Sequence, residues 1–142
     1  MLYNESAPIL ANEEAGCNIW LMTVAAPQIA AAARPGQFVH VKVPGMEGHI
    51  LRRPFGVYAA DAQAGTVDMM YQVLGFGTNH MTSLAPGDAV EMIGPVGRGW
   101  QPSANCKKAL LVAGGVGSAP IHPLACQLAA KGAEVVSILG AQ

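Results

Sequence analysis

The sequence predicts a mainly β protein, in which a closed or nearly closed antiparallel β-barrel precedes the first βαβ unit of an α/β domain. Up to about Trp100, short apolar segments are separated by proline and glycine turns, which is the pattern of barrel strands. Beyond Pro102, a continuous apolar run is followed by a glycine turn and a helical pattern. We therefore divide the chain into a barrel domain at residues 1–102 and an incomplete α/β part at residues 103–142.

The strands of the first part are expected from alternation with a period of two. The clearest case has Val67, Met69 and Tyr71 on one apolar face. The Ala-rich segment Ala30–Ala33 has helical propensity, but it is short and Pro35 would stop a helix there. In chain order, the expected strands are Asn18–Ala25, Phe38–Val43, a strand that begins at Arg53, Thr66–Val73 and Ala89–Ile93.

The second part reads as strand, turn, helix and strand. The apolar run Ala109–Ala113 is typical of a buried parallel strand. A helix is expected at Ile121–Lys131, ended by Gly132, and a second strand at Glu134–Leu139. A single βαβ unit cannot cover both faces of a parallel sheet. We therefore expect the chain to be truncated within a larger α/β domain.

Composition and charge exclude several classes of function. The 142 residues are 51% hydrophobic with a formal net charge of −1, which gives neither a basic field for nucleic acid nor a polybasic membrane anchor. Met1–Gln28 lacks the pattern of a signal peptide, so we expect a cytoplasmic protein. Neither the histidines nor the cysteines show metal-ligand spacing, so no metal site is expected. The three cysteines are instead expected to be buried: Cys17, Cys106 and Cys126.

Two neighbouring motifs predict an anion site. Arg52-Arg53-Pro54 places guanidinium groups at the start of a strand, and Gly75-Phe76-Gly77 opens a short helix expected at Thr78–Leu84. Forked charged donors and the free amides of a helix start suit a pyrophosphate. Arg53 is expected to bind the anion, whereas Arg52 is expected to be a surface charge.

Further residues are compatible with a flavin and a dinucleotide. Phe55 and Tyr71 could form an aromatic wall for a flavin ring, or they could be core aromatics. Gly56 would leave its backbone N–H accessible. The turn Gly114–Gly117 follows a buried strand, as dinucleotide-binding turns do. However, Pro120 stands where a third glycine would be, and a plain β-to-α turn is the alternative.

In this order, the motifs make the chain resemble the ferredoxin reductase-like flavoprotein superfamily, and within it the family of electron-transfer subunits of dihydroorotate dehydrogenase B. The resemblance runs from about Pro35 to Gln142. Its motifs are Pro35-Gly36-Gln37-Phe38-Val39, Leu51-Arg52-Arg53-Pro54-Phe55, Tyr71-Gln72-Val73, Gly75-Phe76-Gly77-Thr78, Pro86-Gly87-Asp88, Gly94-Pro95-Val96-Gly97-Arg98-Gly99-Trp100 and Leu110-Leu111-Val112-Ala113-Gly114-Gly115-Val116-Gly117.

The resemblance implies an antiparallel Greek-key barrel that binds FAD, followed by a nicotinamide-binding α/β domain. It places Arg53 at the FAD phosphates and Gly77 and Thr78 at the pyrophosphate. The remaining residues that it implies are Pro54, Phe55 and Gly56 along the isoalloxazine, Met70, Tyr71 and Gln72 flanking the cofactor, and Gly114, Gly115, Val116 and Gly117 facing NAD(H).

The same resemblance implies an oxidoreductase subunit of pyrimidine biosynthesis. In the complete family protein, electrons pass between NAD(H), FAD and a [2Fe–2S] cluster, and then to the FMN of a dihydroorotate dehydrogenase catalytic subunit. Two departures stand out. Gly56 replaces a usual Ser or Thr, and the cysteine-rich segment that holds the cluster is absent. Because the α/β part holds only two strands, we expect this chain to lack most of the nicotinamide site and to be inactive alone with NADH.

Two other functions remain open. The chain could be the flavin subunit of another NAD(P)H oxidoreductase, such as a sulfhydrogenase-type complex. It could also be a non-catalytic barrel module that binds FAD weakly or not at all.

Overall fold

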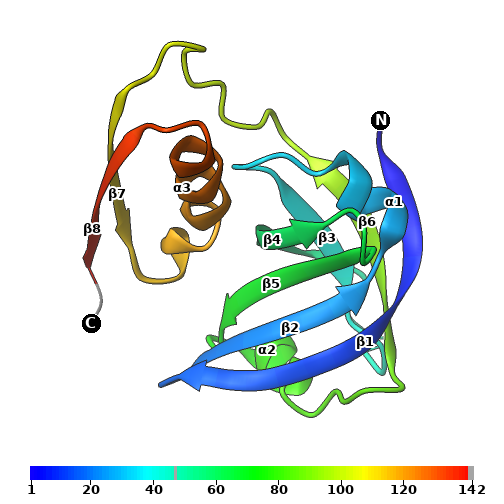
Figure 1. The fold of residues 1–142 in the computed structure, drawn as a ribbon. Coiled ribbons are helices and arrows are strands. Elements are labelled where there is room, and N and C mark those ends of the chain that lie inside the picture. The colour runs from blue at the N-terminus through cyan, green and yellow to red at the C-terminus, as the bar shows by residue number, and fades with distance from the viewer. Residues whose placement is uncertain (47, 141–142) are drawn as a thin grey trace.

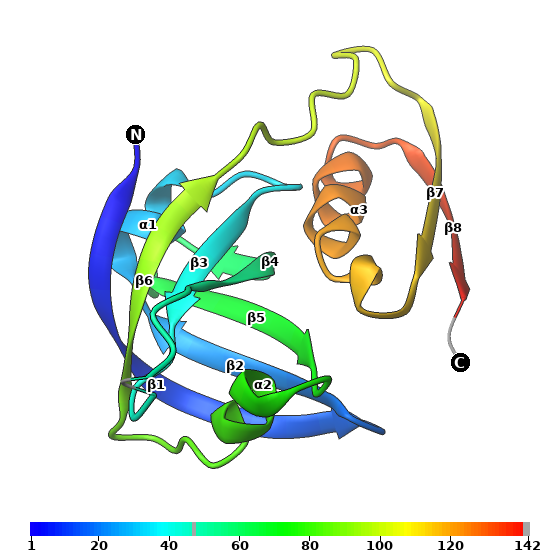
Figure 2. The same ribbon diagram turned by 180° about the vertical axis from the view of Figure 1, so that it is seen from behind.

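The computed structural model describes residues 1–46 and 48–140. It contains a closed six-stranded barrel and a two-stranded parallel sheet, with helix α3 (Ile121–Ala130) lying between the sheet and the barrel (Figures 1 and 2). The predicted mainly β fold, with a barrel first and a βαβ unit second, is confirmed.

The barrel strands are antiparallel and follow the order β1-β2-β5-β4-β3-β6 around the barrel. The neighbours β2 and β5, and likewise β3 and β6, are not consecutive in the chain, which is the Greek-key connectivity. The strands are β1 (Tyr3–Gly16), β2 (Ile19–Ala25), β3 (Phe38–Lys42), β4 (Arg53–Asp61), β5 (Thr66–Gln72) and β6 (Ala89–Val96).

Strand β1 precedes Asn18–Ala25, the segment expected to be first, so that expectation is wrong. The first half of β1 pairs with β6 and its second half with β2, so this one long strand closes the barrel. Sequence alternation misses β1 because only Ala7 and Ile9 are buried along its length. The segment also carries Pro8, which is unusual within a strand.

A short helix, α1 (Pro27–Ala32), caps one end of the barrel, so the expectation that no helix forms before Pro35 is wrong. Pro27 stands at its first position, which suits the fixed φ of proline. The Glu5 carboxylate accepts hydrogen bonds from the Gln28 and Ile29 amides at 3.3 and 2.9 Å. Ile29 is fully buried, so burial and this side-chain acceptor together stabilise the helix.

The barrel core follows the predicted alternation, with Val67, Met69 and Tyr71 each at most 1% exposed.

A second short helix, α2 (Phe76–Met81), starts two residues before the predicted Thr78. Asn12 on β1 ties this helix to the barrel. Its Nδ2 donates to the carbonyl oxygens of Met81 and Leu84 at 2.8 and 2.9 Å, and its Oδ1 accepts from the Tyr71 hydroxyl at 3.0 Å.

The second part is the predicted βαβ unit. Strands β7 (Lys108–Gly114) and β8 (Glu134–Gly140) pair in parallel, and α3 connects them after a 3₁₀ turn, η1 (Gly115–Ser118). The small hydrophobic core of this unit is built from the buried side chains Leu111, Leu124 and Leu128.

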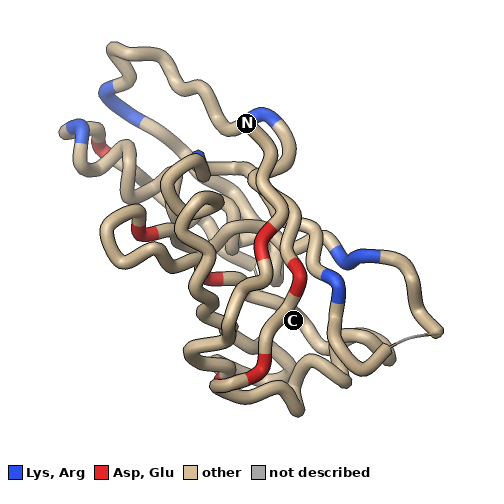
Figure 3. The backbone as a smooth tube through the Cα atoms, turned by 90° about the vertical axis from the view of Figure 1, so that its right-hand side faces the viewer, with Lys and Arg blue, Asp and Glu red and all other residues tan. Residues whose placement is uncertain are grey.

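Charged residues are scattered along the backbone rather than gathered on one element (Figure 3), in keeping with the formal net charge of −1. Among residues 1–46 and 48–140, none of the helices combines the length and apolarity needed to cross a bilayer.

Candidate functional site

A cleft of about 420 Å³ lies between the barrel and the βαβ unit. Strands β4 and β5 and the turn into α2 provide the barrel side, and η1 with the start of α3 provides the other side. We call this the junction cleft. It brings together most of the predicted flavin residues, and its lining is Arg53, Pro54, Phe55, Gly56, Met70, Tyr71, Gln72, Leu74, Thr78, Val116, Gly117 and Pro120.

The alternation of β4 decides which of its residues face the cleft. Phe55 is only 8% exposed and belongs to the barrel core. Its neighbours Pro54 and Gly56 therefore lie on the opposite face of the strand, toward the cleft. Glycine at 56 leaves the backbone of β4 uncovered at this point.

Arg53 and Gly77, which the sequence assigned separately to one anion site, are in close contact. A methyl group on Gly77 would stand 2.5 Å from Nε of Arg53 and 2.9 Å from its Cζ and Nη2. Only glycine therefore allows the guanidinium to lie across the start of α2. Nη1 of Arg53 also donates to the carbonyl oxygen of Leu51 at 2.7 Å, which fixes the side chain near the cleft.

Thr78 organises the turn that leads into α2. Its Oγ1 accepts hydrogen bonds from the amides of Leu74 and Gly75 at 3.0 and 3.1 Å and donates to the Gly75 carbonyl oxygen at 3.1 Å. The amides of the first helical turn have no acceptor inside the helix. With Arg53 alongside, this end of the cleft suits an anion.

On β5, Met70 and Gln72 face outward while Tyr71 points into the barrel. Tyr71 is 1% exposed, and its ring centroid lies 5.9 Å from that of Phe55. Burial raises the pKa of Tyr71 to about 12, although its hydrogen bond with Asn12 acts in the opposite direction. Both aromatic rings are thus core side chains under the floor of the cleft, which was the alternative reading of the sequence.

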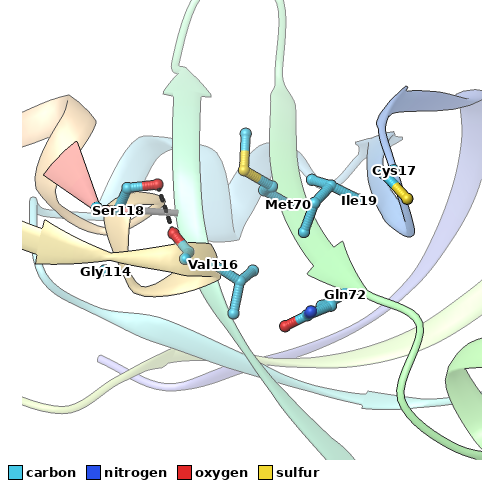
Figure 4. Close-up of a pocket in the computed structure, with 9 residues that line it drawn as sticks. Cys17, Ile19, Met70, Gln72, Gly114, Val116 and Ser118 are labelled. Carbon is cyan, nitrogen blue, oxygen red and sulfur yellow. Dashed lines mark hydrogen bonds between the residues drawn. The ribbon is translucent and has the colours of Figure 1, made fainter. Parts of the chain in front are cut away.

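The predicted dinucleotide turn lines a second cavity of about 700 Å³, which we call the glycine-turn cavity. In Figure 4, Gly114 and Val116 face Met70 and Ile19 across this space. Ser118 Oγ donates to the Gly115 carbonyl oxygen at 2.9 Å, and Gly115 adopts a left-handed φ of 54°. The two cavities lie next to each other, because they share three lining residues: Met70, Gln72 and Val116.

Gly56 and Pro120 meet across the junction cleft. A methyl group on Gly56 would stand 3.1 Å from Cδ of Pro120. The sequence singled out both positions, Gly56 for a missing hydroxyl and Pro120 for a missing glycine, but it did not predict their contact. Pro120 and Leu74 are cleft residues that the sequence analysis did not assign.

The cysteines differ from expectation. Cys17 and Cys126 are exposed and Cys106 is half-buried, so the prediction that all three are buried is wrong. Cys17 lies in the turn between β1 and β2, and Cys126 lies on the side of α3 that faces β4. Within the described part of the chain, no three His, Cys, Asp or Glu side chains converge on a common point.

The family described as the oxidoreductase FAD-binding domain matches residues 8–100, which form most of the barrel. Two curated relatives carry the name dihydroorotate dehydrogenase B (NAD(+)), electron transfer subunit. The chain is 34% identical to the protein from Geobacillus sp. (strain WCH70), over all of this chain and 56% of the relative. It is 40% identical to that from Geobacillus thermodenitrificans (strain NG80-2), over 84% of this chain and 47% of the relative. The chain thus spans about half the length of these relatives.

Among solved structures, the fold is similar to that of an NADH-dependent reduced ferredoxin-NADP oxidoreductase studied for flavin-based electron bifurcation. The TM-score is 0.87 at 28% sequence identity, over 97% of this chain and 49% of the other.

Proposed function

The chain belongs to the oxidoreductase FAD-binding domain family, and on this premise we propose that it is the FAD-binding part of an electron-transfer subunit of the dihydroorotate dehydrogenase B type. The observation that carries the proposal is the junction cleft, which has the positive charge of Arg53 at one end and mainly apolar side chains along the rest of its lining. The names of the curated relatives support the choice of enzyme.

The residues of the cleft fit FAD in two respects. At one end, Arg53 offers a guanidinium, and the first turn of α2 offers backbone amides that have no acceptor within the helix, to a pyrophosphate. Along the cleft, Pro54 and Met70 present apolar surface for a planar ring. When bound, FAD supplies the redox chemistry, because it can take up two electrons together and release them singly.

The protein's own contribution is binding, orientation and exclusion of water. Gly56 exposes its backbone amide to the polar edge of the ring and provides no side-chain hydroxyl there. Pro120 and Val116 cover the cleft from the side of the βαβ unit. No side chain of the cleft is needed as a general acid or base, so we assign no catalytic residue.

The glycine-turn cavity is the proposed site for NAD(H). Gly114 and Gly115 lie at the carboxyl end of β7, where parallel strands present nucleotides to a following turn. Because this cavity shares Met70, Gln72 and Val116 with the junction cleft, a nicotinamide ring there would lie beside the flavin. Residues 1–102 would then bind the flavin and residues 103–142 would begin the nucleotide-binding part.

An iron–sulfur cluster does not fit the described residues. Cys17, Cys106 and Cys126 lie on separate elements, and no metal-binding group forms among residues 1–46 and 48–140. No electron-transfer step through a cluster is therefore assigned to these residues. The proposed partner is the FMN-containing catalytic subunit that oxidises dihydroorotate.

The absorption spectrum of the purified protein tests the flavin assignment. We expect flavin bands after reconstitution, release of FAD rather than FMN on denaturation, and tighter binding of FAD than of FMN in fluorescence titrations. A protein that cannot be reconstituted would instead be the non-catalytic barrel module. Co-purification of the tagged chain with a dihydroorotate-oxidising protein tests the choice of partner separately.

A second candidate is the flavin subunit of a different NAD(P)H oxidoreductase, such as a sulfhydrogenase-type complex. It is favoured by the similarity to the NADH-dependent reduced ferredoxin-NADP oxidoreductase. In that case the chain would bind FAD, but it would co-purify with a partner that has no dihydroorotate-oxidising activity.

A further inference from the structure

On a side of the domain junction away from the flavin residues, α3 carries a cysteine and a histidine in direct contact. Cys126 Sγ lies 3.6 Å from Nε2 of His122, one helical turn earlier. The other ring nitrogen, Nδ1, lies 3.1 Å from the carbonyl oxygen of Tyr58 on β4. We propose that Cys126 is a nucleophilic thiol, served by His122 as its base, that undergoes exchange with low-molecular-mass disulfides.

The carbonyl of Tyr58 decides the roles of the two imidazole nitrogens. A carbonyl oxygen can only accept a hydrogen bond, so Nδ1 of His122 must donate to it. In the neutral imidazole, Nε2 is then the nitrogen with a free lone pair, and it faces Cys126. The thiol is therefore the donor in this contact, and Nε2 is placed to take its proton. A nucleophile, a base and a group that orients the base form the arrangement used to activate thiols.

Ring stacking, in addition to the hydrogen bond with the Tyr58 carbonyl oxygen, holds the imidazole in this position. The rings of Tyr58 and His122 are stacked, with centroids 4.4 Å apart and planes 12° from parallel. The barrel thus fixes the orientation of a side chain that belongs to α3. Without the barrel contact, rotation of the imidazole would exchange its two nitrogens and remove the base from the thiol.

A disulfide can reach this thiol. Cys126 is exposed, and it opens onto a cavity of about 350 Å³ between β4 and α3. The described residues that line this cavity include the cation Arg34 and no acidic side chain. No carboxylate in this lining would therefore repel the thiolate as it forms. The lining is Ala33, Arg34, Pro35, Val57, Tyr58, Ala59, Ala60, His122, Pro123, Cys126 and Gln127.

The proposed reaction is thiol–disulfide exchange. The Cys126 sulfur attacks one sulfur of the disulfide RS–SR while its proton passes to Nε2 of His122. The S–S bond of the reagent breaks, and a Cys126–S–SR bond forms. The departing RS⁻ takes the proton back from His122 and leaves as RSH. The protein thiol is oxidised and the reagent is reduced, so no further oxidant is needed.

The other two cysteines provide matched controls within the same chain. Cys17 is also exposed, but no histidine contact is recorded for it in the described structure. Cys106 is half-buried, and its thiol donates to the Lys108 carbonyl oxygen at 3.4 Å. Exposure alone therefore predicts similar rates for Cys17 and Cys126, whereas base assistance predicts a faster Cys126.

The test uses two single-thiol proteins, one with Cys17→Ser and Cys106→Ser, the other with Cys106→Ser and Cys126→Ser. The probe is 4,4′-dithiodipyridine, a neutral disulfide, and the release of 4-thiopyridone is followed at pH 7. We expect Cys126 to react about tenfold faster than Cys17 or more, because an aligned base typically contributes at least this much. Mass spectrometry should show the mixed disulfide on Cys126, reversed by dithiothreitol.

His122→Phe keeps an aromatic ring beside Tyr58 but removes the base, and His122→Gln is a second variant if the first fails to fold. In either variant, the Cys126 rate should fall to within about twofold of the Cys17 rate, a level with no base assistance. Circular dichroism confirms the fold in each case. Equal rates for Cys126 and Cys17, or an unchanged Cys126 rate in a folded His122 variant, would overturn the proposal.

Discussion

The guanidinium of Arg53 lies directly across the backbone of Gly77, so that a methyl group there would stand 2.5 Å from Nε. Arg53 begins β4, and Gly77 lies in the first turn of α2. The contact therefore joins a charged side chain to a set of free backbone amides at one end of the junction cleft.

Arg53→Ala should weaken FAD binding by about 1.5–3 kcal/mol, the contribution of a hydrogen bond to a charged group. Arg52→Ala is the matched control. Arg52 is occupied elsewhere, with Nη2 at 2.9 Å from the Glu91 carboxylate and Nη1 donating to the Glu91 carbonyl oxygen at 3.0 Å. Fluorescence titration of both variants with FAD measures the difference. A loss for Arg52→Ala as large as that for Arg53→Ala would contradict the assignment.

Gly77→Ala should reduce FAD affinity by displacing the Arg53 side chain, and Gly77→Val should reduce it further. Gly75→Ala is the control, because a methyl group at Gly75 meets no atom within 4 Å and the backbone there is extended. We expect an affinity loss of about tenfold for Gly77→Ala, which is roughly 1.4 kcal/mol. Flavin content and circular dichroism are measured together. Full flavin content in a folded Gly77→Val protein would refute the role of this glycine.

The parts of the fold that sequence could predict are those where burial imposes a simple period. Val67, Met69 and Tyr71 alternate because one face of β5 is the barrel core. Strand β1 was not predicted because it is mostly exposed, and only Ala7 and Ile9 show the alternation of buried residues that indicates a strand. Its role in closing the barrel comes from its length and from pairing with two different strands, and pairing partners leave no local pattern.

For the candidate site too, the sequence could indicate some residues and not others. Arg53 and Gly77 could be proposed because residue type alone indicates anion chemistry. The directions of Phe55 and Tyr71 could not be settled, since a core aromatic and a ligand-binding aromatic look the same in a sequence. The contact between Gly56 and Pro120 depends on how α3 sits against the barrel, and no local pattern encodes that arrangement.

Tyr71→Phe should change how stability depends on alkaline pH. Burial raises the pKa of the folded-state hydroxyl from 10.0 to about 12. Folding therefore favours the protonated form, and the associated stability is fully present below pH 10 and lost as pH rises toward 12. At about 1.4 kcal/mol per pKa unit, the native protein should lose on the order of 2 kcal/mol over this window.

At pH 8, Tyr71→Phe should instead be less stable than the native protein by about 1 kcal/mol, because Asn12 loses its hydrogen-bond donor. Between pH 10 and 12 the difference should shrink and change sign. Urea unfolding across this range measures it. Tyr3→Phe is the control, since Tyr3 makes no side-chain hydrogen bond recorded in the described structure. A constant difference at every pH would show that Tyr71 is not desolvated.

The last prediction concerns the contact between the barrel and the βαβ unit. Gly56→Ala places a methyl group 3.1 Å from Cδ of Pro120, which is tighter than ordinary van der Waals contact. Pro120 must then move or the junction must open, at a cost of about 1 kcal/mol in stability. Pro120→Ala removes the obstructing ring, so the cost of Gly56→Ala should be smaller in that background.

A double-mutant cycle isolates this coupling from the separate effect of each substitution. Four proteins are compared by urea unfolding and by FAD titration: the native chain, Gly56→Ala, Pro120→Ala and the double variant. We expect the double variant to be more stable than the sum of the single losses predicts, and to recover FAD affinity lost by Gly56→Ala. Because Gly56 and Pro120 both line the junction cleft, strictly additive effects in both measurements would mean that their contact does not set the width of the cleft.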